Sequence, residues 1–128
     1  MPNIFNISEQ NTYKITGAFK DEAGAPVLLG ALNTVQMTLY YYNSDLTTSD
    51  RYHLATINSR FRQNIKNVNN VSIDANGNFS WIMQVNDNVK LNGAAQEEQH
   101  RALITWYWTP SKKNSQEIIF NVREVEYI

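Results

Sequence analysis

The 128-residue sequence contains no cysteine, only five glycines and three prolines, and no long apolar run. The lack of cysteine excludes disulfide frameworks, thiolate zinc sites and thiol nucleophiles. The scattered glycines form neither a phosphate-binding loop nor a dinucleotide fingerprint. No stretch has the length of a membrane span, and the start MPNIFNISEQ lacks the basic and apolar regions of a signal peptide. These absences predict a protein of the reducing cytoplasm with no membrane partner.

An excess of charge of one sign is also missing. Eleven basic residues balance twelve acidic residues, for a net charge of −1, which argues against a nucleic-acid partner. Only His53 and His100 could shuttle protons near neutral pH, they lie in different segments, and no G-x-S-x-G elbow accompanies them. The sequence DANGN (74–78) lacks the later glutamate of a calcium loop. We therefore expect no enzyme activity, no catalytic residues, no metal site and no cofactor.

The sequence is rich in alternation of apolar and polar residues with a period of two, which is typical of half-buried β-strands. The alternating segments are 13–19, 35–42, 79–85, 100–108 and 117–128. Polar turns are expected at 20–26, 74–78 and 109–115, the last within a terminal hairpin over 100–128. The segments 85–91 and 92–102 could each hold a single helical turn. The pattern predicts an all-β sandwich in one domain, with at most one or two short helical turns.

The aromatic stretch HRALITWYW (100–108) has two possible interpretations. In a strand, Trp106 and Trp108 share one face and Tyr107 faces the other way. The pair could stack on a sugar ring, as could Tyr40 and Tyr42, which gives a carbohydrate-binding module as the alternative function. The neighbours of the tryptophans on that face are aliphatic, and burial of each aromatic stabilises a core by ~2–3 kcal/mol. We therefore expect Trp81, Trp106, Trp108 and Phe120 to mark the core.

The first twelve residues contain Ile4, Phe5 and Ile7 among polar neighbours. This segment (1–12) could be an edge strand of the domain that spans residues 13–128. Alternatively, it could be an arm that adds to the sheet of a neighbouring subunit. In the second case these three apolar residues would lie in an interface.

Three stretches together resemble a known family. They are ATINSRFRQNIKNVNNVSIDANGNFSWIMQ (55–84), HRALITWYW (100–108) and EIIFNVREVEYI (117–128). Their order and spacing are similar to those of small tailed-bacteriophage virion proteins with an immunoglobulin-like β-sandwich, which are encoded among head and head–tail connection genes. The resemblance covers residues 13–128, and the sequence NSDLTTSDRYHL (43–54) departs from it by lengthening one connection.

The resemblance implies an immunoglobulin-like antiparallel β-sandwich and a non-enzymatic structural role in a virion. Such a protein would decorate the capsid or belong to the neck or collar, and it would be assembled in the host cytoplasm. Its partners would be capsid, portal or connector, or collar subunits, together with further copies of itself in the particle. Asn58, Ser59, Arg60, Gln63 and Asn64 are candidates to order the long segment before the DANG turn. Of these, Asn58, Arg60 and Asn64 could instead contact partner subunits.

Overall fold

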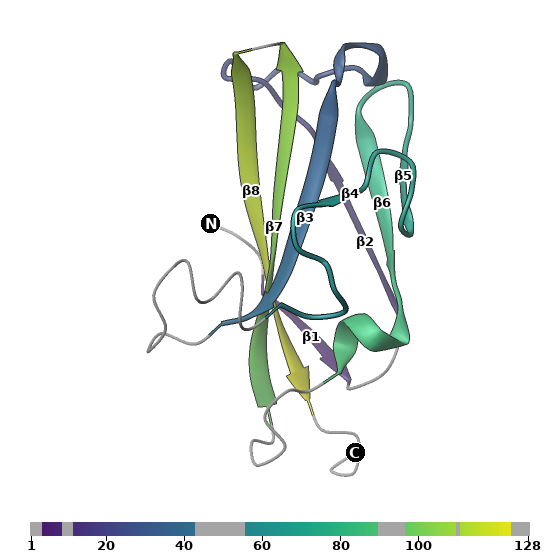
Figure 1. Ribbon diagram of the computed structural model, residues 1–128, viewed down its shortest axis with the longest axis vertical. Helices are drawn as coiled ribbons and strands as arrows, with labels where there is room; N and C mark the ends of the chain where they lie inside the picture. Colours follow the sequence, from purple (N-terminus) through teal and green to yellow (C-terminus); the bar gives the residue numbers. More distant parts are fainter. Residues whose placement is uncertain (1–3, 9–11, 43–55, 90–96, 110, 124–128) are drawn as a thin grey trace.

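The computed structural model describes residues 4–8, 12–42, 56–89, 97–109 and 111–123, which form two β-sheets (Figure 1). The larger sheet has the order β1-β8-β7-β3-β4, with bounds Ile4–Ser8, Lys112–Arg123, Glu97–Thr109, Thr34–Tyr41 and Gln63–Asn64. The smaller sheet has the order β2-β6-β5, with bounds Tyr13–Ala18, Asn78–Met83 and Val71–Ile73. Two 3-10 turns, η1 (Leu29–Ala31) and η2 (Val85–Asn88), are the helical elements of the described residues. None of these residues forms a helix that is long and apolar enough to cross a membrane. The all-β prediction is confirmed.

The long antiparallel hairpin of β7 and β8 forms the centre of the larger sheet (Figure 1). Strand β3 pairs antiparallel with β7, and β1 pairs parallel with the last part of β8, from Ile4 opposite Ile119 to Ser8 opposite Arg123. Residues 4–8 are thus an edge strand of the domain's own sheet, and Ile7 is buried in its core. Ile7 therefore packs within the domain in this arrangement, and its interface role stays a prediction. The side chains of Ile4 and Phe5 lie outside what the structure describes.

The two sheets pack face to face through their inward aromatic side chains. Phe19 stacks on Phe79 with ring centroids 5.0 Å apart, and it also contacts Trp106 of the other sheet at 5.1 Å. Trp81 of β6 meets Phe120 of β8 edge-on at 6.4 Å. Trp81, Trp106 and Phe120 are buried, as expected of core residues. Trp108, at the end of β7, differs from that expectation because it packs against the core and is only partly buried.

Two segments differ from the sequence-based expectation. Strand β8 begins at Lys112, so most of the loop expected at 109–115 is strand paired with β7. Residues 112–116 are exposed and polar, and their pairing uses main-chain groups that do not depend on side-chain hydrophobicity. The helical turn considered for 92–102 is wrong for residues 97–102, which belong to β7, and residues 92–96 lie outside the described part. The turn considered for 85–91 is confirmed by η2.

The DANGN turn joins β5 to β6 and packs against the segment before η1. The Oδ1 atom of Asp74 accepts hydrogen bonds from the backbone N–H groups of Asn76 at 2.9 Å and Asn78 at 3.0 Å. Gly77 has φ +82°, a left-handed conformation that favours glycine. A Cβ atom added at Gly77 would lie 2.1 Å from the carbonyl oxygen of Val27. The turn therefore requires glycine for both its backbone conformation and its packing.

Replacement of Gly77 tests this packing. We expect Gly77→Ala to lower the free energy of unfolding by about 3 kcal/mol, because backbone strain is added to a collision with main-chain atoms that cannot move aside. Gly24 is the matched control, because it has the same φ of +82° with open space around the added Cβ. Gly24→Ala should cost about 1 kcal/mol, from backbone strain alone. Chemical denaturation of both variants measures the difference, and equal losses would contradict the proposed contact.

The carboxylate of Asp74 makes the same turn sensitive to pH. The pKa of Asp74 is lowered, mainly because the backbone N–H of Asn78 donates a hydrogen bond to it. A lowered folded-state pKa means that the ionised group stabilises the fold above its unfolded-state pKa. That contribution is lost as the pH falls through the folded-state pKa.

We expect Asp74→Ala to lower the Tm at pH 7, and the gap from wild type to narrow as the pH falls into the range where Asp74 is protonated. Thermal melts across this pH range measure the gap. Asp74→Asn keeps an acceptor oxygen for both N–H groups and should lower the Tm less than Asp74→Ala at pH 7. A gap that stays constant down to strongly acidic pH would refute the electrostatic part of this account.

Candidate functional site

The asparagine-rich segment INSRFRQNIKNVNN (57–70) connects the edge of the larger sheet to β5 of the smaller sheet. Six of its residues have a left-handed backbone with φ between 47° and 74°: Asn58, Ser59, Arg62, Asn67, Asn69 and Asn70. Asparagine adopts this conformation at lower cost than most non-glycine residues. The richness in asparagine is therefore a consequence of a tightly coiled connection.

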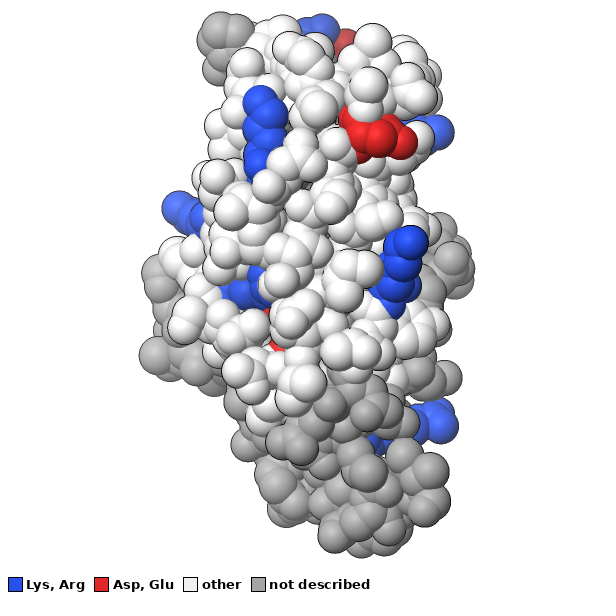
Figure 2. Space-filling view, turned by 90° about the vertical axis from the view of Figure 1, so that its right-hand side faces the viewer, with Lys and Arg blue, Asp and Glu red and all other residues white. Residues whose placement is uncertain are grey.

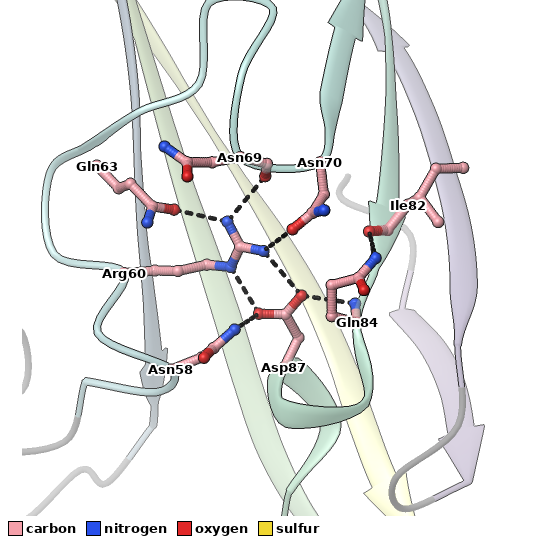
Figure 3. Close-up of polar contacts among 8 residues, drawn as sticks. All are labelled: Asn58, Arg60, Gln63, Asn69, Asn70, Ile82, Gln84 and Asp87. Carbon is pink, nitrogen blue, oxygen red and sulfur yellow. Dashed lines mark hydrogen bonds and ion pairs between the residues drawn. The ribbon is translucent and has the colours of Figure 1, made fainter.

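The guanidinium of Arg60 lies at the centre of this connection (Figure 3). Arg60 is 2% exposed and forms a two-pronged ion pair with Asp87 of η2, which is fully buried. Its Nε is 2.6 Å from Oδ1 of Asp87, and its Nη2 is 3.0 Å from Oδ2. This parallel geometry is the strongest arrangement that arginine and a carboxylate adopt.

Both partners of the ion pair are fully hydrogen-bonded. The remaining donors of Arg60 reach Oε1 of Gln63 at 2.6 Å, the carbonyl of Asn69 at 3.1 Å and Oδ1 of Asn70 at 3.0 Å. All five N–H groups of the guanidinium therefore have acceptors. Asp87 also accepts from Nδ2 of Asn58 at 2.9 Å and from the backbone N–H of Gln84 at 2.8 Å (Figure 3). The guanidinium and the carboxylate are thus fully used within the chain, and the ion pair pins the connection.

The structure separates the polar residues that were interface candidates. Arg60 is buried and bonded within the chain, so its assignment to a surface interface is wrong. Asn58 is an exposed residue, and its side-chain amide donates a hydrogen bond to Asp87. Asn64 is exposed on β4, and its Oδ1 accepts from the backbone N–H of Lys66 at 3.1 Å. Asn58 and Asn64 thus combine an ordering role with accessibility at the surface.

Neither aromatic pair considered for carbohydrate binding forms an exposed platform. Trp106 is 3% exposed, and its indole N–H donates to the carbonyl of Lys20 at 3.0 Å. Tyr40 is 2% exposed, and its hydroxyl donates to the carboxylate of Glu117 at 2.5 Å. The ring of Tyr42 is covered by the guanidinium of Arg101, 3.6 Å from the ring centroid. In each pair, at least one ring is buried and has no face free to stack on a sugar.

A second buried polar pair, Glu98 and His100, lies on β7. Oε2 of Glu98 is 2.6 Å from Nε2 of His100, both side chains are buried, and the ring of His100 packs edge-on against Phe120. Sequence reasoning missed Glu98 because the stretch EEQH was considered for a helical turn. Period-two alternation through Glu98, His100 and Ala102 was the available signal. The other candidate histidine, His53, lies outside the described residues.

A surface ion pair ties the β7–β8 turn to the loop after β2. Nζ of Lys112 lies 2.7 Å from Oε1 of Glu22, and both side chains are largely exposed. The hydrogen bond from Lys112 lowers the pKa of Glu22, and the same bond raises the pKa of Lys112. An exposed pair of this kind contributes little to stability.

The described residues contain no group of three or more His, Cys, Asp or Glu side chains that could hold a metal ion. Comparison with protein-family models, with curated proteins and with solved structures found no match for this chain. The function is therefore inferred from the residues and their geometry.

A double-mutant cycle tests the pinning role of the ion pair. Arg60→Met should lower the free energy of unfolding by about 3–5 kcal/mol, because the carboxylate of Asp87 is left buried without its charge partner. The double variant Arg60→Met, Asp87→Leu should lose less than the sum of the two single losses, by ~2 kcal/mol or more. Urea denaturation measures all four proteins. Lys112→Met, which breaks an exposed pair, is the control and should change stability little. Additive losses at Arg60 and Asp87 would show that they are not coupled.

Proposed function

We propose that this chain is a non-enzymatic structural protein of a tailed-phage virion, where it decorates the capsid or belongs to the neck or collar. The proposal is supported by the position in the fold of the three stretches that resemble that family. The asparagine-rich connection, the DANG turn, Trp81, Trp106 and Phe120 are all structural parts of one sandwich. A chain whose distinguishing residues support its own fold suits a building block better than an enzyme.

The strand arrangement supports an immunoglobulin-like assignment within this proposal. The order β2-β6-β5 within the smaller sheet would match strands B, E and D of such a sandwich. In the other sheet, β3, β7 and β8 would match C, F and G, and the short β4 would match C′. The chain departs from antibody domains in having no B–F disulfide, and its buried Trp81 lies on the strand in the E position.

Docking onto other virion subunits would require a rigid body with accessible neutral surfaces. The ion pair of Arg60 and Asp87 holds the asparagine-rich connection, and the side chain of Asp74 holds the β5–β6 turn. Figure 2 shows the molecule from the right-hand side of Figure 1, and most of the described surface there is uncharged, with the Lys and Arg side chains set apart from one another. Such a surface suits contacts by shape and hydrogen bonding with neighbouring protein subunits.

Particle composition tests the proposal directly. In density-purified particles of the phage whose genome encodes this chain, mass spectrometry should detect the protein in several copies per particle. A replication protein of the same phage is the control, because it should be present in the lysate and lost on purification. Absence of the chain from particles that retain their major capsid and portal proteins would overturn the proposal.

A further inference from the structure

Strand β2 is the outermost strand of the smaller sheet and pairs only with β6 among the described strands. The backbone N–H of Phe19 donates to the carbonyl of Gly77, so odd-numbered residues of β2 direct their main-chain groups toward β6. The even-numbered residues Lys14, Thr16 and Ala18 then direct theirs away from the sheet. No hydrogen bond within the described part of the chain uses these outward groups.

The opposite edge of the same sheet is protected in a way that β2 is not. On β5, the outward N–H groups belong to Val71 and Ile73. The first donates to the carbonyl of Val68 at 3.3 Å, and the second donates to Oδ1 of Asn67 at 2.6 Å. Strand β2 is twice as long, with six residues against three, and has only Lys14 as a charged side chain. An open edge of this length is a template for another extended strand.

The side chains beside this edge are small and mostly neutral. Thr16 lies opposite Ser80 of β6, which in turn lies opposite Ser72 of β5, so that three hydroxyl side chains cross the outer face in one row. Ala18 and Asn78 form the next row. These residues line a shallow hollow on the outer face of the sheet. Among the described residues, the outer face beside Thr16 and Ala18 therefore carries only small or polar side chains.

We infer that β2 is a self-association edge, and that two copies of this chain pair antiparallel through it about a two-fold axis at Thr16. In this register Thr16 faces its own counterpart, and Lys14 faces Ala18 of the other copy. Each of the three outward residues then exchanges an N–H···O=C pair, whereas a shift by two residues leaves one of them unpaired. The two smaller sheets would join into one continuous sheet with the order β5-β6-β2-β2-β6-β5.

The charges on the outer face agree with this register. Lys14 lies at one end of β2, and Asp74 lies beyond the other end, next to the row of Ala18 and Asn78. In the antiparallel arrangement, Lys14 of each copy continues a cross-strand row of the other copy. That row consists of Ala18, Asn78 and Asp74. An aspartate is ionised at neutral pH, and the pKa of Asp74 is lowered further by the backbone N–H of Asn78. Opposite charges therefore lie on one cross-strand row, with Ala18 and Asn78 between them, and the two lysines stay apart.

The absence of cysteine permits a direct test of the two-fold axis. Thr16→Cys places one thiol on each copy at the axis, where cross-strand Cα atoms lie within the range that a disulfide spans. We expect mild oxidation to convert this variant to a disulfide-linked dimer. Ser80→Cys is the matched control, because it replaces a hydroxyl residue of the same row one strand away from the axis, and it should remain monomeric on a denaturing gel. Equal cross-linking of the two variants, or none at Thr16→Cys, would overturn the inference.

Association without cross-linking completes the test. Sedimentation of the full chain over a range of concentrations should show a monomer–dimer equilibrium. Thr16→Pro removes one outward N–H without touching the ladder with β6, since proline is accepted on an edge strand when its nitrogen faces outward. We expect this variant to weaken dimerisation at least tenfold with an unchanged circular dichroism spectrum, and Thr16→Ala to associate as wild type does. A wild-type chain that stays monomeric, or a dimer unaffected by Thr16→Pro, would refute pairing through β2.

Discussion

The buried ion pair of Arg60 and Asp87 joins two parts of the chain that no strand pairing connects. Arg60 belongs to the connection that follows β3, where its carbonyl accepts from the backbone N–H of Leu39 at 2.8 Å. Asp87 belongs to η2, directly after β6 of the other sheet. Removal of two charges from water costs several kcal/mol per ion, and only complete hydrogen bonding offsets it. That requirement fixes the path of the connection, because its amide and carbonyl oxygens must accept hydrogen bonds from the planar guanidinium of Arg60.

An apolar pair of similar volume could stabilise the sandwich as well as the ion pair does. Such an apolar pair would not require the left-handed backbone of Asn69 and Asn70. The oxygens of these two residues complete the set of acceptors around the Arg60 guanidinium. Packing between the sheets is provided separately, by Phe19, Trp81 and their aromatic neighbours. The polar network therefore determines which connection forms, and the apolar core provides most of the burial.

The period of two in the sequence predicted the longer strands because those strands bury one face and expose the other. The DANG turn was predicted for the same local reason, since Asp74 and Gly77 suit a tight turn on their own. The partner of Arg60 could not be predicted, because Asp87 lies 27 residues away and only the fold brings it close. Strands β4 and β5, with two and three residues, are too short to show a period. The start of β8 could not be predicted, because its residues are polar and exposed on both faces and show no alternation of apolar and polar residues.

The described edges of the two sheets differ in how far other parts of the chain cover them. Strand β4 has only two residues, and the outward N–H groups of β5 are already bonded within the chain. Strand β1 covers β8 from Ile119 to Arg123 and places Ile7 in the core, so the N-terminal strand closes part of the larger sheet. Unpaired donors on β2 cost little while water reaches them, and they become bonds only when another strand arrives. A rigid body with an edge such as β2 is suited to assembly from identical parts, because each copy carries both halves of the contact.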